Sequence, residues 1–462
     1  MNRHSALFTL LAFMTLLLPA IPASAEEFDL DHTKEVLEKL VEQELATGVA
    51  SISIALVKGD EIVWTAAYGY ANVYTKTPAT PETIYVTGST FKSVTATAIL
   101  QLVEQGKCKL DNPVNQYLGD VQIDDNEKRP VTIRHILSHT SGLTSGAQTV
   151  NLWDRKLPAT LEEMTKKLKS IRPVEEQYEY NNFAYGMVGL LVEEISGMSY
   201  EDYVVEKILA PLGVKTAHPI EPNAVMVERM ALPYVKTPKG TPLPVSRVRY
   251  DVYPAGDVYL TAEDMVRFLA AHLNGGEFRG ARILNRKSVK EAHTKQFFDY
   301  GLGWSMGESE DGHTVIQHGG GVPGFNTFMA GDVDAKVGVY VMSNSGNMRP
   351  IAMAALALLR GEAYVSPGER KEIPLDAAKL TRFPGVYELT PRFKITITNE
   401  DGHLFAQATG QGKLALFPES ETKFFIKVVD AQITFKSDAS GKVTSLTLHQ
   451  NGRDQMAKRV RD

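Results

Sequence analysis

Three short segments of the sequence carry side chains suited to acyl transfer, and the first is Ser89-Thr90-Phe91-Lys92. Its hydroxyl and amine lie three residues apart and therefore share one face of a helix. Serine is a weak nucleophile at neutral pH and needs a base, which Lys92 can supply if burial or neighbouring groups lower its pKa. A Ser-x-x-Lys pattern arises by chance about one to three times in a chain of this length. The alternative interpretation is a helix N-cap serine beside an exposed lysine.

The second segment is Tyr180-Asn181-Asn182. A phenol with a lowered pKa can relay protons between the nucleophile, the lysine and a leaving group. The amide of Asn182 can orient Lys92 and hold a substrate amide. Tyr70-Ala71-Asn72 has the same pattern, but it lies at the end of a predicted hairpin strand, so we do not include it in the site.

The third segment is the run His318-Gly319-Gly320-Gly321, which leads into a predicted strand. Glycines let a ligand approach backbone N–H groups closely, so Gly319, Gly320 and Gly321 are predicted to line the substrate site. The N–H groups of Gly321 and Ser89 together would form an oxyanion hole. His318 would place a polar group at the edge of the pocket. An ordinary glycine-rich turn is the alternative.

In this order, the three segments resemble the penicillin-recognising serine hydrolases, in the branch with class C β-lactamases, serine DD-peptidases, D-aminopeptidases and related esterases. Further matching segments are His135-Ile-Leu-Ser-His139-Thr-Ser-Gly-Leu143, Pro254-Ala-Gly256-Asp257 and Tyr300-Gly-Leu-Gly-Trp304. The resemblance covers about residues 30–360. It implies that Ser89 forms an acyl-enzyme and that Lys92 and Tyr180 transfer protons. Residues 376–462, with Gly385-Val386-Tyr387, resemble the lipocalin-like C-terminal domain of some members.

The elements around these segments predict an α+β fold. Apolar periodicity predicts helices over 31–46, capped by Asp31, and over 89–105. Alternating residues predict a hairpin of 51–57 with 61–70. Later strands at 303–306, 326–330 and 337–342 precede a closing helix at 351–360, after a helix-rich region over 131–300. We therefore expect an antiparallel sheet flanked by helices, with a large helical insertion, as in the β-lactamase/transpeptidase fold that the resemblance implies.

Composition changes along the chain predict four parts. Residues 1–25 are predicted to be a signal peptide, because a 13-residue apolar run precedes the small-residue site Ala23-Ser24-Ala25. An uncleaved anchor is the alternative. Residues 26–364 form the predicted catalytic domain, 365–375 a linker and 376–462 a small antiparallel β-barrel. The mature protein is predicted to be secreted or periplasmic and to have no transmembrane segment.

Charge and cysteine content exclude several classes of function. The mild net charge of -6 gives no support for nucleic acid as a partner and does not suggest docking on an anionic membrane. The lone Cys108 cannot form an internal disulfide. His135 and His139 lie four residues apart, as on a metal-binding helix. No glutamate lies between them and no third ligand stands out, so neither a metal nor another cofactor is predicted, and the resemblance implies structural roles for both.

The third segment also bears on the substrate. Class C β-lactamases usually have lysine and then a hydroxyl residue there, and DD-carboxypeptidases usually keep the hydroxyl. In this chain His318 stands in place of the lysine, and Gly319 stands in place of the hydroxyl residue. A substrate carboxylate therefore loses two hydrogen-bond partners, each worth about 1–3 kcal/mol. The His-Gly-Gly pattern resembles D-aminopeptidase-like members, so the predicted activity is a peptidase or amidase for small peptides that contain D-residues.

Several alternatives stay open. A carboxylesterase acting on small esters and a β-lactamase are the nearest ones. A penicillin-binding sensor with little turnover and a metallohydrolase belong to other classes. The C-terminal barrel could bind a ligand, cover the pocket, support a homo-oligomer or simply add stability, because a fold alone does not give a function.

Overall fold

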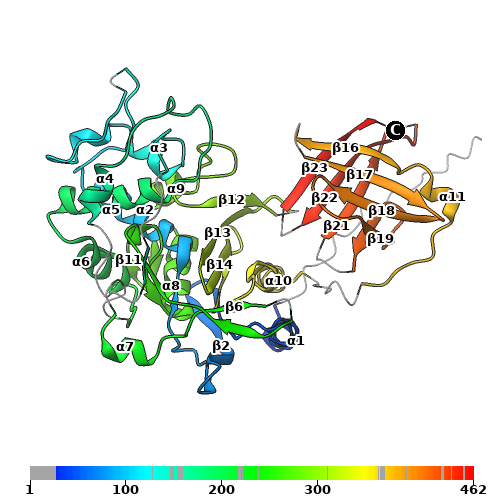
Figure 1. Cartoon of the computed structure of the whole chain (residues 1–462), viewed down its shortest axis with the longest axis horizontal. Coiled ribbons are helices and arrows are strands. Elements are labelled where there is room, and N and C mark those ends of the chain that lie inside the picture. The colour runs from blue at the N-terminus through cyan, green and yellow to red at the C-terminus, as the bar shows by residue number, and fades with distance from the viewer. Residues whose placement is uncertain are drawn as a thin grey trace, which may run out of the picture.

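The predicted N-terminal hairpin forms part of a seven-stranded antiparallel sheet (Figure 1). The strand order is β12-β13-β14-β15-β1-β2-β3, so β1 pairs on one side with a strand from near residue 340. β1 is buried along its whole length except at Lys58, so the alternating Ser51 and Ser53 are buried as well as the apolar residues beside them. The strands are β1 Ser51–Lys58, β2 Glu61–Asn72, β3 Thr77–Pro78, β12 Ser305–Glu308, β13 Thr314–Val322, β14 Phe325–Asp332 and β15 Val337–Ser343.

This computed structural model describes residues 28–461 except 127, 146–149, 153–159, 217–219, 221, 238, 310, 363, 365–369, 391–392, 428–430, 439 and 451–452. The predicted signal peptide, residues 1–25, lies outside the described residues, as does part of the predicted linker. Among the described helices, none combines the length and apolar character needed to cross a membrane.

The first and last helices of the catalytic region cover one face of the sheet. α1 (Leu30–Ala46) and α10 (Arg349–Leu359) pack with the β1 side chains Ile52 and Ile54 in one apolar cluster. The predicted cap of α1 is wrong by two residues. Asp29, not Asp31, accepts hydrogen bonds from the first free N–H groups of the helix.

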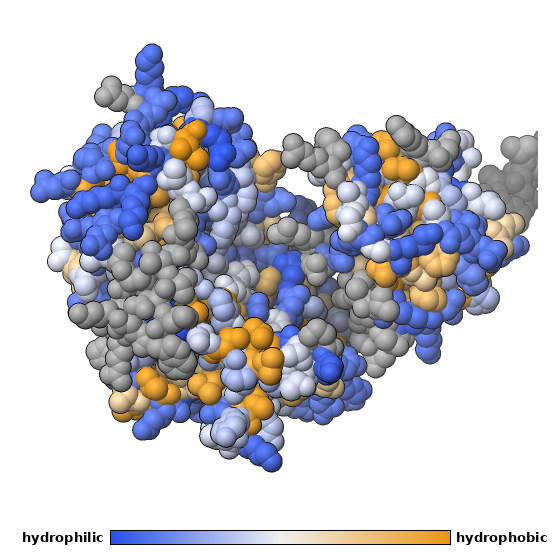
Figure 2. Space-filling view, viewed as in Figure 1, coloured by the Kyte–Doolittle hydropathy of each residue, from blue (hydrophilic) through white to orange (hydrophobic). Residues whose placement is uncertain are grey.

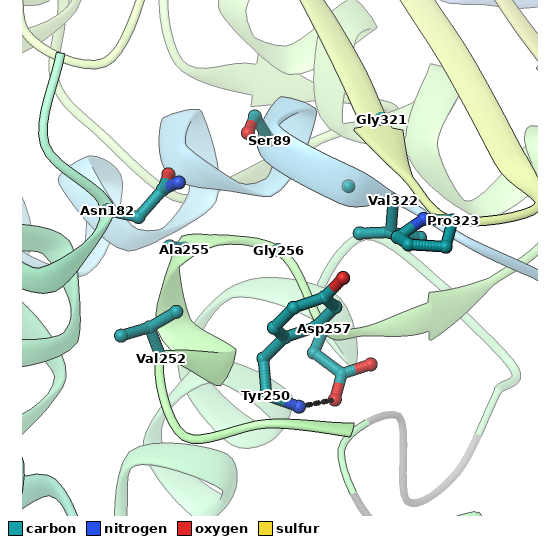
Figure 3. Close-up of a pocket in the computed structure, with 11 residues that line it drawn as sticks. Ser89, Asn182, Tyr250, Val252, Ala255, Gly256, Asp257, Gly321, Val322 and Pro323 are labelled. Carbon is teal, nitrogen blue, oxygen red and sulfur yellow. Dashed lines mark hydrogen bonds between the residues drawn. The ribbon is translucent and has the colours of Figure 1, made fainter. Parts of the chain in front are cut away.

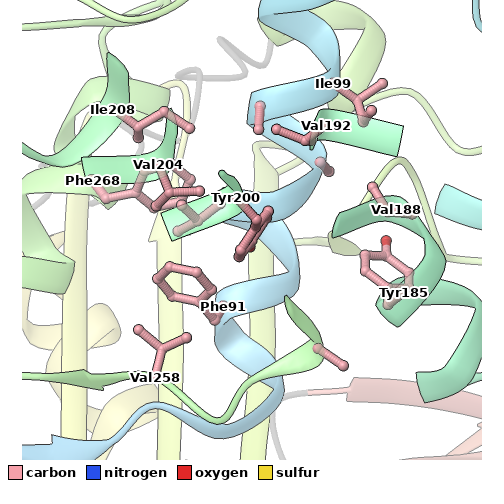
Figure 4. Packing of buried hydrophobic residues seen from close by; sticks show 14 of the residues in the cluster. Phe91, Ile99, Tyr185, Val188, Val192, Tyr200, Val204, Ile208, Val258 and Phe268 are labelled. Atoms are coloured by element: carbon pink, nitrogen blue, oxygen red, sulfur yellow. The ribbon is translucent and has the colours of Figure 1, made fainter. Parts of the chain in front are cut away.

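The opposite face of the sheet carries the helical insertion. α8 (Ala262–Leu273) lies directly on the sheet at Gly331 and Gly338, where an added Cβ would approach leucine side chains of α8 to within 2.8 and 2.7 Å. On this face of the sheet, α8 shares the largest apolar core with the helices at 92–104 and 182–196, at the start of which the first two predicted segments lie (Figure 4). The other helices are α2 Lys92–Glu104, α3 Ile133–Leu137, α4 Leu161–Thr165, α5 Asn182–Ser196, α6 Tyr200–Val204, α7 Ala224–Glu228 and α9 Arg286–Ala292, with short turns η1 Gly88–Phe91, η2 Val114–Gln116, η3 Val205–Leu209 and η4 Tyr253–Ala255.

Four two-stranded sheets connect these helices. They pair β4 with β9, β5 with β8, β6 with β7, and β10 with β11. Figure 2 shows a mainly hydrophilic surface on the displayed face, with hydrophobic residues gathered near β6, and the exposed side chains of that hairpin include Val235 and Leu243. The strands are β4 Tyr85–Val86, β5 Val150–Leu152, β6 Tyr234–Lys236, β7 Pro242–Pro244, β8 Val248–Tyr250, β9 Tyr259–Leu260, β10 Glu277–Phe278 and β11 Ala281–Arg282.

The C-terminal residues form a closed barrel of eight antiparallel strands, in agreement with the predicted β-barrel. Pairing of β16 with β23 closes it, and neither of these strands was singled out from the sequence pattern. Aromatic rings of Phe383, Phe424 and Phe435 fill one part of its interior, and α11 (Ala377–Leu380) precedes the first strand. The strands are β16 Gly385–Thr390, β17 Phe393–Glu400, β18 His403–Ala408, β19 Leu414–Pro418, β20 Lys423–Ile426, β21 Ala431–Ser437, β22 Val443–Gln450 and β23 Arg453–Arg461.

Candidate active site

The first predicted pair, Ser89 and Lys92, lies at the start of the central helix. The helix predicted over 89–105 begins as the 3₁₀ turn η1 and continues as α2. Lys92 Nζ donates hydrogen bonds to Ser89 Oγ at 2.9 Å and to the carbonyl of Ala255 at 2.9 Å. The exposed lysine of the alternative interpretation does not occur, because Lys92 is completely buried. The i, i+3 spacing thus places an amine directly on the hydroxyl of a serine.

Burial controls the protonation of Lys92. No ion pair to this amine occurs within the described residues, and its neighbours are the rings of Tyr180 and Tyr185, 4.8 and 5.5 Å from Nζ. An ammonium without a carboxylate partner is costly to hold in such surroundings. Desolvation therefore lowers the pKa of Lys92 well below its ordinary value. Such an amine can accept a proton near neutral pH.

Tyr180 lies beside the same pair but differs from its predicted state. It hydrogen-bonds with Ser89, and the residue as a whole is 38% exposed. Desolvation of the phenol raises the pKa of Tyr180 above its usual range, and the bond with Ser89 only partly opposes this rise. The predicted lowered pKa is therefore wrong for the free protein. Tyr180 holds its proton, so it can donate a proton but is a poor resting base.

Asn182, at the start of α5, does not orient Lys92 as predicted. The backbone carbonyl of Ala255 has that role, whereas Asn182 Oδ1 is buried without a hydrogen-bond partner among the described residues. The preceding Asn181 caps α5 by accepting from the N–H of Ala184. A buried acceptor without a donor is unfavourable. Asn182 thus carries an unused acceptor and is also one of the residues that line the cleft described below.

The glycine run lies at the end of β13, next to Ser89. Val322 and Phe325 pair across the two-residue turn of the β13–β14 hairpin. Because bonded and non-bonded positions alternate along antiparallel strands, the N–H of Gly321 points away from β14. A Cβ on Gly88 would lie 2.7 Å from the nitrogen of Gly321, and one on Gly320 would lie 3.1 Å from that of Ser89. The two predicted oxyanion donors are therefore close neighbours.

His318 is a buried, neutral side chain at the edge of this site. Its Nδ1 donates to the carbonyl of Gly319 at 2.8 Å, which leaves Nε2 to accept from the hydroxyl of Tyr300 at 2.9 Å. Burial first, and then the nearby Lys92, lower the pKa of His318 to about 4. His318 therefore supplies no positive charge at neutral pH. Tyr300 was part of a matching segment, but its contact with His318 was not foreseen.

A cleft of about 410 Å³, open to solvent, is lined by Ser89, Asn182 and Gly321 of the predicted site (Figure 3). Gly319 and Gly320, which were predicted to line it, are not among its lining residues. Ser89 lies on one side and the Tyr250 ring on another, with Asn182 and Val252 at one end and Pro323 at the other. Sequence reasoning missed Tyr250 and Val252, which precede the quoted Pro254–Asp257 segment. The complete lining is Gly88, Ser89, Asn182, Tyr250, Val252, Ala255, Gly256, Asp257, Gly321, Val322 and Pro323.

The only charged side chain in that lining is already neutralised. Asp257 forms an ion pair with Arg249 at 3.0 Å and also accepts from the N–H of Tyr250 and the hydroxyl of Tyr259. These bonds fix the loop that carries Tyr250 and Val252. The cleft therefore presents neutral hydrogen-bonding and apolar groups to a ligand.

His139 does not lie on a helix, in contrast to the spacing that suggested a helical pair with His135. α3 ends at Leu137, and His139 adopts a left-handed backbone conformation with φ of 60°. His135 instead accepts from the N–H of Thr132 and faces Glu175 at 3.6 Å. The helical metal-pair geometry considered for His135 and His139 is therefore wrong.

Comparison with known proteins identifies the family of the chain. A family model described as Beta-lactamase matches residues 37–362. The chain belongs to the β-lactamase family. This identifies it as a serine hydrolase fold of the penicillin-recognising group, as the sequence resemblance implied. A second model, described as a domain of unknown function (DUF3471), matches residues 369–459.

Three relatives of this β-lactamase-family chain are informative. Penicillin-binding protein 4* of Bacillus subtilis strain 168 is 27% identical over 457 residues, covering 93% of this chain and 98% of the relative. The octameric penicillin-binding protein homologue of Pyrococcus abyssi is 26% identical with a TM-score of 0.63, covering 92% and 100%. The D-amino acid amidase of Ochrobactrum anthropi SV3 is 23% identical with a TM-score of 0.57, covering 71% and 98%, which shows a shared fold.

The close packing around Gly320 gives a first testable prediction. An alanine Cβ there would lie 2.3 Å from Thr327 Oγ1 and 2.4 Å from the carbonyl of Thr87. Either β13 or η1 must shift, so Gly320→Ala should lower kcat by about 10- to 100-fold and destabilise the fold by about 1–3 kcal/mol. Gly412→Ala is the matched control, because nothing lies within 4 Å of its Cβ. Equal kcat values for both variants, measured with a chromogenic ester, would contradict the expectation.

Proposed function

We propose that this protein hydrolyses amides through an acyl-enzyme on Ser89. The observation that carries the proposal is the contact of the fully buried Lys92 Nζ with Ser89 Oγ at 2.9 Å. In the first step, neutral Lys92 takes the Ser89 proton while Oγ bonds to the substrate carbonyl carbon. The N–H groups of Ser89 and Gly321 stabilise the oxyanion.

The proton then moves to the leaving group. Tyr180 is hydrogen-bonded with Ser89 and keeps its proton at neutral pH, so it donates to the leaving amine and is reprotonated by the Lys92 ammonium. Collapse of the tetrahedral intermediate expels the amine and leaves Ser89 acylated. Water attacks the ester with the same groups in reverse, which releases the acid and restores neutral Lys92. The opposite pKa directions of Lys92 and Tyr180 favour the lysine as the resting base.

Peptides or amides that contain D-residues are the proposed substrates. The described residues that line the cleft offer no free positive charge to a substrate carboxylate, nearby His318 is uncharged, and Gly319 has no hydroxyl. The buried acceptor Asn182 Oδ1 suits an amide N–H of the substrate. The fold shared with the Ochrobactrum D-amino acid amidase agrees with this choice.

A matched substrate panel tests this class. D- and L-amino-acid amides, a short D-peptide, acetate esters and a penicillin should differ in kcat/KM, and we expect the D-amides to exceed the L-amides by at least about tenfold. Equal rates for both enantiomers, or hydrolysis of esters alone, would instead identify a carboxylesterase.

Restoring a hydroxyl at Gly319 tests the reason for the selectivity. The Cβ of Gly319→Ser would meet only the Phe328 ring, at 3.5 Å, so the variant should fold. The added donor should raise kcat/KM for carboxylate-bearing penicillins by about tenfold, while neutral amides change little. If the ratio of kcat/KM for penicillins to kcat/KM for neutral amides does not change, Gly319 does not set the preference for neutral substrates.

A penicillin-binding sensor is the second candidate, because a relative covering nearly the whole chain is named a penicillin-binding protein. Intact-mass measurement with labelled penicillin separates the two functions. A stable Ser89 adduct without product release would support the sensor, and rapid release would support the hydrolase.

The arrangement of the chain is also proposed. We infer a signal peptide over 1–25 with export from the cytoplasm, a catalytic domain over 26–364, a linker over 365–375 and a barrel domain over 376–462. The two matching family models, over 37–362 and 369–459, support the last boundaries. The octameric Pyrococcus homologue supports self-association, for which sedimentation of the full chain and of a chain lacking 376–462 is the test.

A further inference from the structure

His139 lies beneath the Tyr180 ring and holds the chain on both sides of that residue. Its carbonyl accepts from the N–H of Glu179 at 2.8 Å, and its ring Nδ1 accepts from the N–H of Asn181 at 3.1 Å. These are the residues immediately before and after Tyr180. The imidazole also packs on the Tyr180 ring, with centroids 4.2 Å apart and planes 37° apart. One side chain therefore contacts both the backbone and the ring that carry the candidate proton donor.

The hydrogen bond from Asn181 fixes the protonation state of His139. Because Nδ1 accepts from an amide, the ring proton must be on Nε2. Nε2 has no hydrogen-bond partner in the described part of the chain, although His139 is only 1% exposed. Burial and the proximity of Lys92 also lower the pKa of His139 well below its ordinary value. The ring is therefore a neutral acceptor next to the catalytic amine and adds no charge that would disturb Lys92.

The backbone of His139 shows that this placement is imposed by its surroundings. A left-handed conformation, here with φ of 60°, is unfavourable for a residue with a bulky side chain. Such a conformation persists only where neighbouring contacts fix it. Here the rings of Tyr178, Tyr180, Tyr185 and Tyr300 all lie within 5.7 Å of the imidazole centroid. The four rings leave the imidazole little freedom to move.

We propose that His139 is a positioning residue for Tyr180, which sets the height and tilt of the phenol relative to Ser89 through the Nδ1 bond and the ring contact. This inference rests on the proposed role of Tyr180 in proton transfer. It assigns no proton transfer to His139 itself, because its basic nitrogen is occupied by Asn181. Its effect on the reaction must therefore pass through Tyr180.

Two variants separate the two contacts. His139→Phe keeps an aromatic ring under Tyr180 but leaves the N–H of Asn181 without its acceptor. His139→Asn keeps an acceptor, tolerates the left-handed backbone and removes the ring contact. We expect kcat for an amide substrate to fall by about 100-fold in His139→Phe and about tenfold in His139→Asn, with KM within about threefold. His135→Asn, four residues earlier and outside the cleft, is the control and should keep its kcat.

A double-mutant cycle with Tyr180→Phe shows whether the effect passes through the phenol. In a chain that already carries Tyr180→Phe, each His139 substitution should change kcat by less than about twofold. If each His139 substitution lowers kcat by the same factor in the wild type and in Tyr180→Phe, the inference is wrong. If His139→Phe gives no cooperative thermal transition, His139→Asn carries the same cycle alone. Wild-type activity of Tyr180→Phe or Ser89→Ala would instead overturn the proposed function, so the two failures are distinguishable.

Discussion

Replacing Ser89 with alanine should lower kcat for every substrate class by on the order of 10⁴-fold or more, because the acyl-enzyme cannot form without Oγ. Intact-mass spectra of the wild type with a slow substrate or a penicillin should show one added acyl group, and Ser89→Ala should show none. The fold should be little affected, because Ser89 is only half-buried and, within the described residues, its Oγ bonds only with Lys92 and Tyr180. The thermal midpoint is therefore expected to change by a few degrees at most.

Ser93→Ala is the matched control for this variant. Ser93 lies one turn further along α2 and donates to the carbonyl of Gly303 at 2.7 Å. Its loss should cost about 1 kcal/mol of stability and leave kcat within about threefold. Ser89→Ala with more than about one hundredth of wild-type activity, or an acyl adduct on another residue, would exclude Ser89 as the nucleophile.

Lys92→Met should lower the acylation rate by about 10³- to 10⁴-fold, since it removes the base but keeps a side chain of similar length in a buried site. Lys92→Arg should not restore the rate, because a guanidinium cannot become neutral in a protein. Single-turnover kinetics with a chromogenic ester, followed by mass spectrometry of the adduct, would measure the acylation step directly. A wild-type acylation rate in Lys92→Met would assign the base to another group.

The pH dependence gives the same prediction a second measurement. Neutral Lys92 is the active form, so kcat/KM should rise as pH increases through its folded pKa, which lies well below 10.5. The unfolded chain binds the Lys92 proton up to about pH 10.4, whereas the folded chain has already lost it. Stability therefore rises with pH between the two pKa values. In Lys92→Met, neither kcat/KM nor the free energy of unfolding should rise with pH over this range. If both still rise as in the wild type, Lys92 is not the base.

Much of the site could be predicted from the sequence because its key contacts are local or are encoded by residue type. Ser89 and Lys92 lie on one helix, and the i, i+3 spacing alone brings the hydroxyl and the amine together. Glycine at positions 319–321 indicated close backbone approach, and Gly320 indeed has no room for a Cβ. The alternating strands of the barrel could likewise be predicted, since their period of two reflects burial. In β1 the burial is continuous, because β2 and β15 flank the strand and helices cover both faces of the sheet.

Contacts between distant segments could not be predicted in the same way. The carbonyl of Ala255 that holds Lys92, the hydroxyl of Tyr300 on His318 and the wall formed by Tyr250 come from loops whose positions depend on the packed core. The cap of α1 was misplaced because Asp29 and Asp31 are equally suitable residue types and only the backbone path decides between them.

The sequence by itself determined the identity and order of the candidate reactive groups, because residue type and local spacing fix which chemistry is available. Only the tertiary structure decided their protonation states. Burial lowers the pKa of Lys92, raises the pKa of Tyr180 against the prediction, and lowers the pKa of His318 to about 4. The physical reason is that a pKa depends on desolvation and neighbouring charges, which arise only when distant segments pack around the same atoms.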